Sequence, residues 1–254
     1  SPRVIAEELA RQLSKEKTFT RVEVAGGGFL NFWFLKETLT KELSEIVKKK
    51  GAYGTKKLAK AQKKKIQVEF VSANPTGPLT LANGRGGFLG DAIAHVLTSA
   101  GHEVEREYYV NDAGNQVRTF GLSLMANAGL IPFEENFYKG EYVKEWAEKN
   151  VAIVKKLKSD PEKLGATASK DFLKLIKTAV EKKAGILFDR YTSEQHDIHD
   201  KKLIDKTLAL FKELHVTYEQ DGALWLKTTD FGDDKARVLI TSEETPTCFM
   251  ADAG

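Results

Sequence analysis

The stretch IQVEFVSANPTGPLTLANGRGGFLGDAIAHVLTSAGHEVEREYYV, residues 66–110, decides the fold. Apolar and polar residues alternate from Ile66 to Phe70, which is typical of a β-strand. Two prolines and four glycines then predict a loop over residues 72–87. Phe88 to Ala100 has the pattern of a helix, and Val104 to Val110 that of a second strand. A strand, a loop, a helix and a strand in this order predict a βαβ unit with two parallel strands.

The loop at residues 72–87 is the part of this unit best placed to hold a ligand. Open parallel sheets bind ligands at the carboxyl ends of their strands, where this loop begins. The next helix points the free N–H groups of its N-terminus at the same place, which favours an anion such as phosphate. The loop has neither the GxGxxG nor the GxxxxGK[ST] pattern, so the dinucleotide and Walker fingerprints do not apply. Judged on these residues alone, a purely structural role stays open.

The flanking segments predict further units. Residues 1–60 have the pattern of a small α+β unit with a helix, two strands and a second helix. Apolar residues in 115–215 recur mostly with a helical period. Residues 216–226 predict a hairpin, and residues 237–241 predict another strand. The expected fold class is therefore α/β.

The composition is that of an ordinary globular protein, with 254 residues, 41% hydrophobic and 30% charged. The single cysteine, Cys248, excludes a disulfide framework and a Cys-rich zinc module, and it is typical of a reducing compartment. The five histidines show no zinc-ligand pattern, so no metal site is predicted. No apolar run approaches the roughly 20 residues that span a bilayer, and the N-terminus lacks the plan of a signal peptide. We therefore expect a cytoplasmic protein with no membrane partner.

Positive charge is concentrated in one segment. The chain has 39 basic and 36 acidic residues, yet nine lysines and no acid lie between Ile46 and Val68, and the remainder is net acidic. We call these nine lysines, from Lys48 to Lys65, the lysine cluster. A polyanion would be attracted to it first. The alternative is a solvated linker whose lysines contact nothing.

Several segments resemble bacterial-type arginyl-tRNA synthetases, and they occur in the family's order along the whole chain. These segments are IAEELA (5–10), VEVAGGGFLNF (22–32), the run from Val68 to Gln116, FDRYTSEQ (188–195), YEQDGALWLKTTDFGDDKARVLI (218–240) and TPTCFMAD (245–252). The resemblance implies a class I aminoacyl-tRNA synthetase with a Rossmann-like catalytic domain.

The same resemblance implies a division into domains. Residues 1–60, with the Lys-rich linker, are similar to an N-terminal appended domain that contacts tRNA in the family. Residues 61–126 are similar to the first half of the catalytic domain, 127–235 to a mostly helical insertion, and 236–254 to the return to the catalytic domain. The family's later parts, including its Lys-Met-Ser-Lys-type loop and anticodon-binding domain, have no match here. The chain is therefore expected to be an N-terminal portion of a longer protein.

The resemblance assigns four residues to arginine binding: Glu69, Asn74, Cys248 and Asp252. A guanidinium group needs carboxylate and amide oxygens as acceptors, and three of the four supply them. Cys248 stands where the family usually has an arginine-contacting tyrosine, so the pocket is altered. Considered without the family, Glu69 fits an outward strand residue, and Asn74 fits a turn former before proline.

The resemblance places ATP at the start of the helix, on Pro78, Thr80, Asn83 and Gly84. The family's His-x-Gly-His motif falls at residues 80–83, where this chain has Thr-Leu-Ala-Asn. The catalytic role of the two histidines would therefore pass to Thr80 and Asn83. These side chains donate neutral hydrogen bonds but cannot supply an imidazolium charge, which weighs against vigorous catalysis.

Taken together, the resemblance implies an arginine–tRNA ligase that uses ATP, accompanied by Mg²⁺, with L-arginine and arginine tRNA as partners. Lys63, Lys64 and Lys65 are expected to contact tRNA phosphates. This chain alone is expected to be inactive, and we expect a monomer with no DNA partner.

A catalytically silent RNA-binding paralogue is the alternative. The altered Thr80 and Cys248 favour the paralogue. The intact Glu69, Asn74 and Asp252 favour the enzyme.

Overall fold

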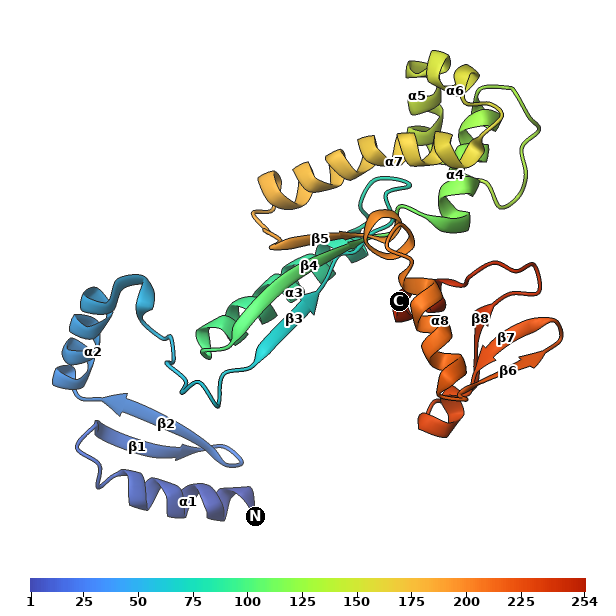
Figure 1. Ribbon diagram of the computed structural model, residues 1–254. Coiled ribbons are helices and arrows are strands. Elements are labelled where there is room, and N and C mark those ends of the chain that lie inside the picture. Colours follow the sequence, from blue (N-terminus) through green and yellow to red (C-terminus); the bar gives the residue numbers. More distant parts are fainter. The chain divides into compact units, whose positions relative to one another are not determined.

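The computed structural model describes every residue from Ser1 to Gly254, and the chain divides into two units, Ser1–Lys57 and Leu58–Gly254 (Figure 1). In the smaller unit, a hairpin is flanked by two helices, as the sequence predicts. Its elements are α1 (Pro2–Leu13), β1 (Phe19–Ala25), β2 (Phe29–Phe34), α2 (Lys36–Lys49) and a 3-10 turn (Lys50–Ala52). Strands β1 and β2 pair antiparallel. The ring of Phe19 packs 5.0 Å and 5.2 Å, between centroids, from those of Phe32 and Phe34.

Three parallel strands organise the larger unit. They are β3 (Lys65–Glu69), β4 (Glu103–Val110) and β5 (Arg190–Ser193), in the order β3-β4-β5. Helix α3 (Leu81–Ser99) connects β3 to β4, which confirms the predicted βαβ unit. Strand β5 was not predicted, because it lies in the range whose apolar period indicated helices. It has four residues, RYTS, too few to show an alternating pattern.

Helix α3 begins at Leu81 and not at Phe88, so the predicted start is wrong. Thr80 caps the helix, and three of the four glycines that indicate a loop, Gly84, Gly86 and Gly87, lie inside its first turns. Gly90 explains why a glycine is retained deeper in this helix. A Cβ atom there would lie 2.2 Å from Cγ of Phe70, so glycine lets α3 lie directly against the end of β3.

The connection from β4 to β5 is helical. It contains α4 (Gly114–Asn127), α5 (Glu141–Lys149), α6 (Val151–Lys156), α7 (Pro161–Lys177) and a π-helical turn (Thr178–Lys183). Helices α4 and α7 cross with their backbones in contact at two glycines. A Cβ on Gly121 would lie 1.8 Å from the Pro161 carbonyl oxygen, and one on Gly165 would lie 1.9 Å from that of Val117. A core around Phe120, Leu124 and Leu164 surrounds this crossing.

The C-terminal part forms a second sheet. A π-helical turn (Glu194–His199) leads to α8 (Leu203–Glu213), β6 (Thr217–Gln220), β7 (Ala223–Leu226), a 3-10 turn (Thr228–Phe231), β8 (Arg237–Ile240) and α9 (Cys248–Ala253). The hairpin predicted over residues 216–226 is confirmed. Its turn residues Asp221 and Gly222 have φ of 53° and 74°, as a type I′ turn requires.

Strand β8 belongs to the second sheet. It pairs antiparallel with β7 and does not join the parallel sheet. The apolar residues of β7, β8 and α9 form a core of their own, centred on Leu226, Leu239 and Met250. Burial of these side chains stabilises β8 beside β7.

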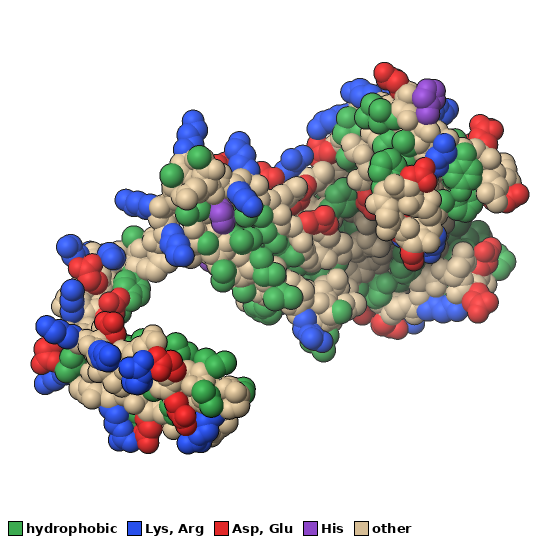
Figure 2. Space-filling view, turned by 90° about the horizontal axis from the view of Figure 1, so that it is seen from below, with side chains coloured by type: hydrophobic (Ala, Val, Ile, Leu, Met, Phe, Trp, Pro, Cys, Tyr) green, Lys and Arg blue, Asp and Glu red, His purple; other side chains and the backbone are tan.

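The surface of the larger unit is partly apolar, and Figure 2 shows hydrophobic side chains gathered on one face of it. Helix α3 contributes exposed Leu81, Phe88 and Leu89. None of the helices has both the length and the apolar character needed to cross a membrane.

Candidate functional site

The two faces of the parallel sheet have different surroundings. On β4, Arg106 lies 3.7 Å from Asp91 of α3, and Tyr108 packs with Ile176 of α7. Even-numbered residues of β4 therefore face the helices. The odd-numbered residues, Tyr109 among them, project from the opposite face.

Tyr109 is the centre of the candidate site. Its hydroxyl is buried and has no hydrogen-bond partner. Burial raises the pKa of Tyr109, and four nearby carboxylates raise that pKa further, so the phenol stays neutral. We call these four residues the acidic cluster: Glu69, Asp112, Glu194 and Asp252. They come from the end of β3, the end of β4, the end of β5 and helix α9.

The acidic cluster holds an uncompensated negative charge. None of its members forms an ion pair with a lysine or arginine, and the one basic partner is His199, whose Nε2 lies 3.3 Å from Oε1 of Glu194. Burial raises the pKa of Glu194, the hydrogen bond from His199 lowers it, and Asp112 and Asp252 raise it. Parallel strands bring Glu69, Asp112 and Glu194 to one edge of the sheet, which is where such sheets bind ligands.

Asp112 is held firmly in this arrangement. Its carboxylate accepts hydrogen bonds from the Ser193 hydroxyl at 2.7 Å and from the Gln195 N–H at 3.0 Å. Because Ser193 ends β5 and Gln195 lies just beyond it, the contact ties the ends of β4 and β5 together.

The loop after β3 carries Asn74 and has a strained backbone. Val71 and Ser72 have φ of 66° and 35°, a region that non-glycine residues rarely adopt. The loop is fixed to β4, because the Tyr109 N–H donates to the Ser72 hydroxyl at 3.0 Å. Beyond it, the Asn74 side-chain oxygen accepts from the Asn111 amide at 2.9 Å. The strain is thus retained where the chain turns toward the candidate site.

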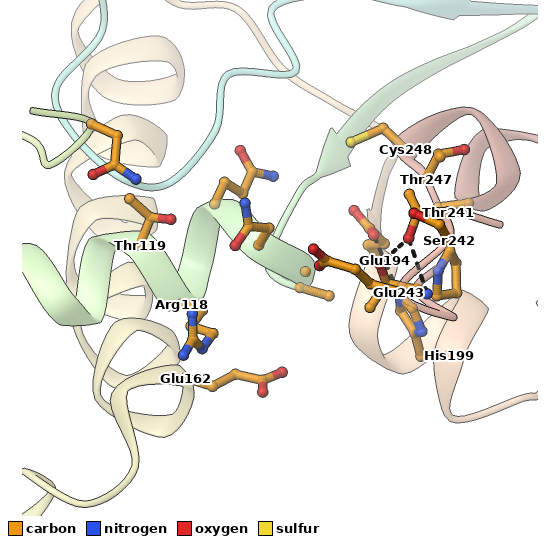
Figure 3. A pocket seen from close by; sticks show the side chains of 18 of the residues that line it. Arg118, Thr119, Glu162, Glu194, His199, Thr241, Ser242, Glu243, Thr247 and Cys248 are labelled. Atoms are coloured by element: carbon orange, nitrogen blue, oxygen red, sulfur yellow. Dashed lines mark hydrogen bonds and ion pairs between the residues drawn. The ribbon is translucent and has the colours of Figure 1, made fainter. Parts of the chain in front are cut away.

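A cavity of about 1220 Å³ is lined by Glu194 and by no other member of the acidic cluster. Figure 3 shows Arg118, Thr119 and Glu162 on its helical side, facing Glu194, His199, Cys248 and their neighbours on the other. Cys248, predicted to contact arginine, therefore shares a cavity wall with Glu194. The volume exceeds that of most small-molecule sites, which leaves room for a second group beside an amino acid.

The residues predicted to bind ATP surround the start of α3. The Thr80 hydroxyl donates to the Asn83 side-chain oxygen at 2.6 Å and accepts from the Asn83 N–H at 3.3 Å. The Asn83 oxygen also accepts from the Thr80 N–H at 2.9 Å, which completes a capping box. The Asn83 amide N–H₂ group and the first N–H groups of the helix are left as donors.

None of the four predicted ATP-binding residues has a free backbone N–H, since those of Thr80 and Asn83 are used in the capping box. The Gly84 N–H donates to the Thr80 carbonyl at 3.1 Å, inside the helix. Pro78 is exposed and has no N–H to donate.

The predicted tRNA-contacting lysines lie at the amino end of β3, the opposite end from Glu69. All three are exposed. Lys63 Nζ is 4.0 Å from Glu103, and the Lys64 backbone N–H donates to His102 at 3.3 Å. Two of the three ammonium groups, those of Lys64 and Lys65, form no ion pair.

Four residues of the site have no role in the sequence prediction: Tyr109, Asp112, Glu194 and His199. The first three lie in segments that carry the family resemblance. The signal that could have identified Glu194 is its place directly after a strand of the parallel sheet, and that strand was missed.

Known proteins similar to this chain agree with one another. A sequence model described as "tRNA synthetases class I (R), catalytic domain" matches residues 42–253, and one described as "Arginyl tRNA synthetase N terminal domain" matches residues 1–34. The arginine–tRNA ligase of Syntrophotalea carbinolica is 39% identical over 269 aligned residues, which cover 99% of this chain and 47% of that protein. The chain thus spans about half the length of the curated relatives it matches.

Solved structures show the same similarity. A structure from Campylobacter jejuni, described as a candidate arginyl-tRNA synthetase, has a TM-score of 0.71 and 32% identity, covering 86% of this chain and 49% of that one. The arginyl-tRNA synthetase of Thermus thermophilus has a TM-score of 0.57 and 25% identity, covering 99% of this chain and 43% of that one. By its sequence along almost its whole length, and by its fold, this chain belongs to the family of class I arginyl-tRNA synthetases.

Proposed function

We propose that this chain is part of an arginine–tRNA ligase, which activates L-arginine with ATP and transfers it to arginine tRNA. The observation that carries the proposal is the acidic cluster at the carboxyl edge of the parallel sheet. It presents four carboxylates and no resident Lys or Arg partner. A guanidinium group is the ligand that planar carboxylate acceptors suit best.

In this proposal, Glu69, Glu194 and Asp252 accept the N–H groups of the guanidinium. Asn74, fixed by its bond to Asn111, offers an amide to the amino-acid end of arginine. The neutral Tyr109 hydroxyl faces the same carboxylates and finds the partner it lacks when arginine binds. Cys248 lines the wall and contributes surface rather than charge.

The chemistry of activation fits the start of α3. An oxygen of the arginine carboxylate attacks the α-phosphorus of ATP, and pyrophosphate leaves. Asn83 offers its amide N–H₂ to the phosphates, since the Thr80 hydroxyl is occupied in the capping box. Thr80 then acts by holding Asn83 in position. Pro78 and Gly84 would flank the nucleotide without donating to it.

Mg²⁺ needs no dedicated site in this scheme. The chain does not group three or more His, Cys, Asp or Glu side chains as a metal site would. Mg²⁺ usually binds through the phosphates of its nucleotide and offsets part of their negative charge. A cytoplasmic monomer fits this function and the single free cysteine.

The direct test is ATP–pyrophosphate exchange by the full-length protein, with and without arginine tRNA. We expect exchange that requires arginine and is not supported by lysine or by citrulline, which lacks the positive charge. Exchange with citrulline as fast as with arginine would contradict the role of the acidic cluster. No exchange with any amino acid, together with retained tRNA binding, would favour the silent RNA-binding paralogue.

A second expected result concerns the lysine cluster. Replacing Lys63, Lys64 and Lys65 with alanine should weaken tRNA binding. It should also reduce the slope of log affinity against log salt concentration by about 2, because each lost phosphate contact lowers that slope by somewhat less than one unit. Filter binding between roughly 50 and 200 mM salt measures the slope. Lys201→Ala, which breaks an ion pair with Asp197 outside the cluster, is the matched control. An unchanged slope in the triple variant would assign the three lysines to a solvated linker.

A further inference from the structure

The π-helical turn from Glu194 to His199 has a specific geometric effect. In it, the Asp200 N–H donates to the Gln195 carbonyl at 2.9 Å, five residues back. In an α-helix, residues five apart point about 140° away from each other. The wider π-turn brings such residues onto one face, so the His199 ring reaches the Glu194 carboxylate. An α-helical turn here would separate this pair.

The charges around Glu194 come from three elements. His199 faces it from its own turn, Asp112 from the end of β4, and Asp252 from α9. Tyr109 adds a neutral hydroxyl. Glu194 is thus the most enclosed member of the acidic cluster, with 7% of its surface exposed, and His199 is its one favourable partner.

We propose that His199 is a positioning residue for arginine: its ring donates to one Glu194 oxygen and holds the other oxygen, ionised, toward the cavity. The inference rests on the proposed function. The hydrogen bond requires only that Nε2 carries a hydrogen, so the neutral ring can donate as well as the charged one. The Glu194–His199 bond is drawn at the cavity wall in Figure 3.

The effect of His199 has a definite sign with pH. Burial and the two aspartates raise the pKa of Glu194, and the His199 bond opposes them. Removing His199 raises that pKa further, so a larger fraction of Glu194 is protonated at a mildly acidic pH. A protonated Glu194 does not attract guanidinium. The deficit in arginine binding should therefore be largest at low pH and shrink as pH rises.

The experiment titrates arginine into the full-length protein by calorimetry between pH 5.5 and 8.5. We expect His199→Ala to weaken binding about tenfold at pH 6 and by no more than about threefold at pH 8.5, as for a hydrogen bond to a charged group that is lost. His199→Gln keeps an N–H donor and should stay within about threefold of the unmodified protein.

His196→Ala is the matched control. His196 lies in the same π-turn and also contacts a carboxylate, Asp200 at 2.9 Å, but it is exposed and outside the acidic cluster. It should change arginine binding less than about twofold.

Three outcomes would overturn the inference, and they are distinguishable. Equal binding by His199→Ala and the unmodified protein would remove the role of His199 and leave the proposed function intact. A loss that is the same at every pH, and is not rescued by glutamine, would indicate a merely structural role. If the unmodified protein binds no arginine at any pH, the proposed function fails together with the inference.

Discussion

Gly165→Ala is expected to lower the free energy of unfolding of the larger unit by about 3 kcal/mol or more. The added Cβ would lie 1.9 Å from the Val117 carbonyl oxygen, and the whole of helix α7 would have to move away from α4 to admit it. The core around Phe120 and Leu164 would open with it. Chemical denaturation followed by circular dichroism measures the loss.

Gly86→Ala is the matched control for this substitution. Gly86 is also helical, and a Cβ there meets nothing within 4 Å. Because alanine favours helix and restricts the unfolded chain, this variant should be unchanged or more stable by up to about 1 kcal/mol. Equal stability of the two variants would show that the helices can separate without cost.

Asp252→Asn and Glu194→Gln should each lower kcat/KM for arginine by at least about 100-fold in the full-length protein, with the larger part of the effect in KM. Each change keeps the shape of the side chain and removes one of the charges proposed to pair with the guanidinium, and the loss of one member of a charge pair costs several kcal/mol. Steady-state ATP–pyrophosphate exchange measures both constants.

The control for these two variants is Glu213→Gln, an exposed carboxylate at the end of α8 that forms no ion pair. It should leave both constants unchanged. If Asp252→Asn and Glu194→Gln keep the KM of the unmodified protein, the acidic cluster does not bind the guanidinium, and arginine must be held elsewhere.

The elements that the sequence predicted well are those whose pattern is local. Ile66 to Phe70 alternates, Asp221-Gly222 suits a tight turn, and both gave the correct structure. The sequence hides the start of α3 because glycines are typical of loops, while Thr80 and Asn83 form a cap whose two halves are three residues apart. A cap of this kind is visible in a sequence only if asparagine is considered at the position usually held by glutamate or glutamine.

The elements that the sequence could not predict depend on distant partners. Strand β5 is a strand because β4 offers it an edge, and its four residues carry too little pattern of their own. Strand β8 has an ordinary strand pattern, but nothing in it shows whether β7 or the parallel sheet is its neighbour. The same limit applies to the site. Glu69 and Asp252 follow from the family resemblance, and both lie near enough to Tyr109 to raise its pKa, whereas Glu194 depends on where β5 ends.

The crossing of α4 and α7 also limits how this chain can change over generations. When two side chains clash, a smaller residue at one position can relieve a larger one at the other. Here the obstacles are the carbonyl oxygens of Pro161 and Val117, which every amino acid possesses. No substitution elsewhere can make space for a side chain at Gly121 or Gly165, so both positions can vary only if the path of a helix backbone changes first.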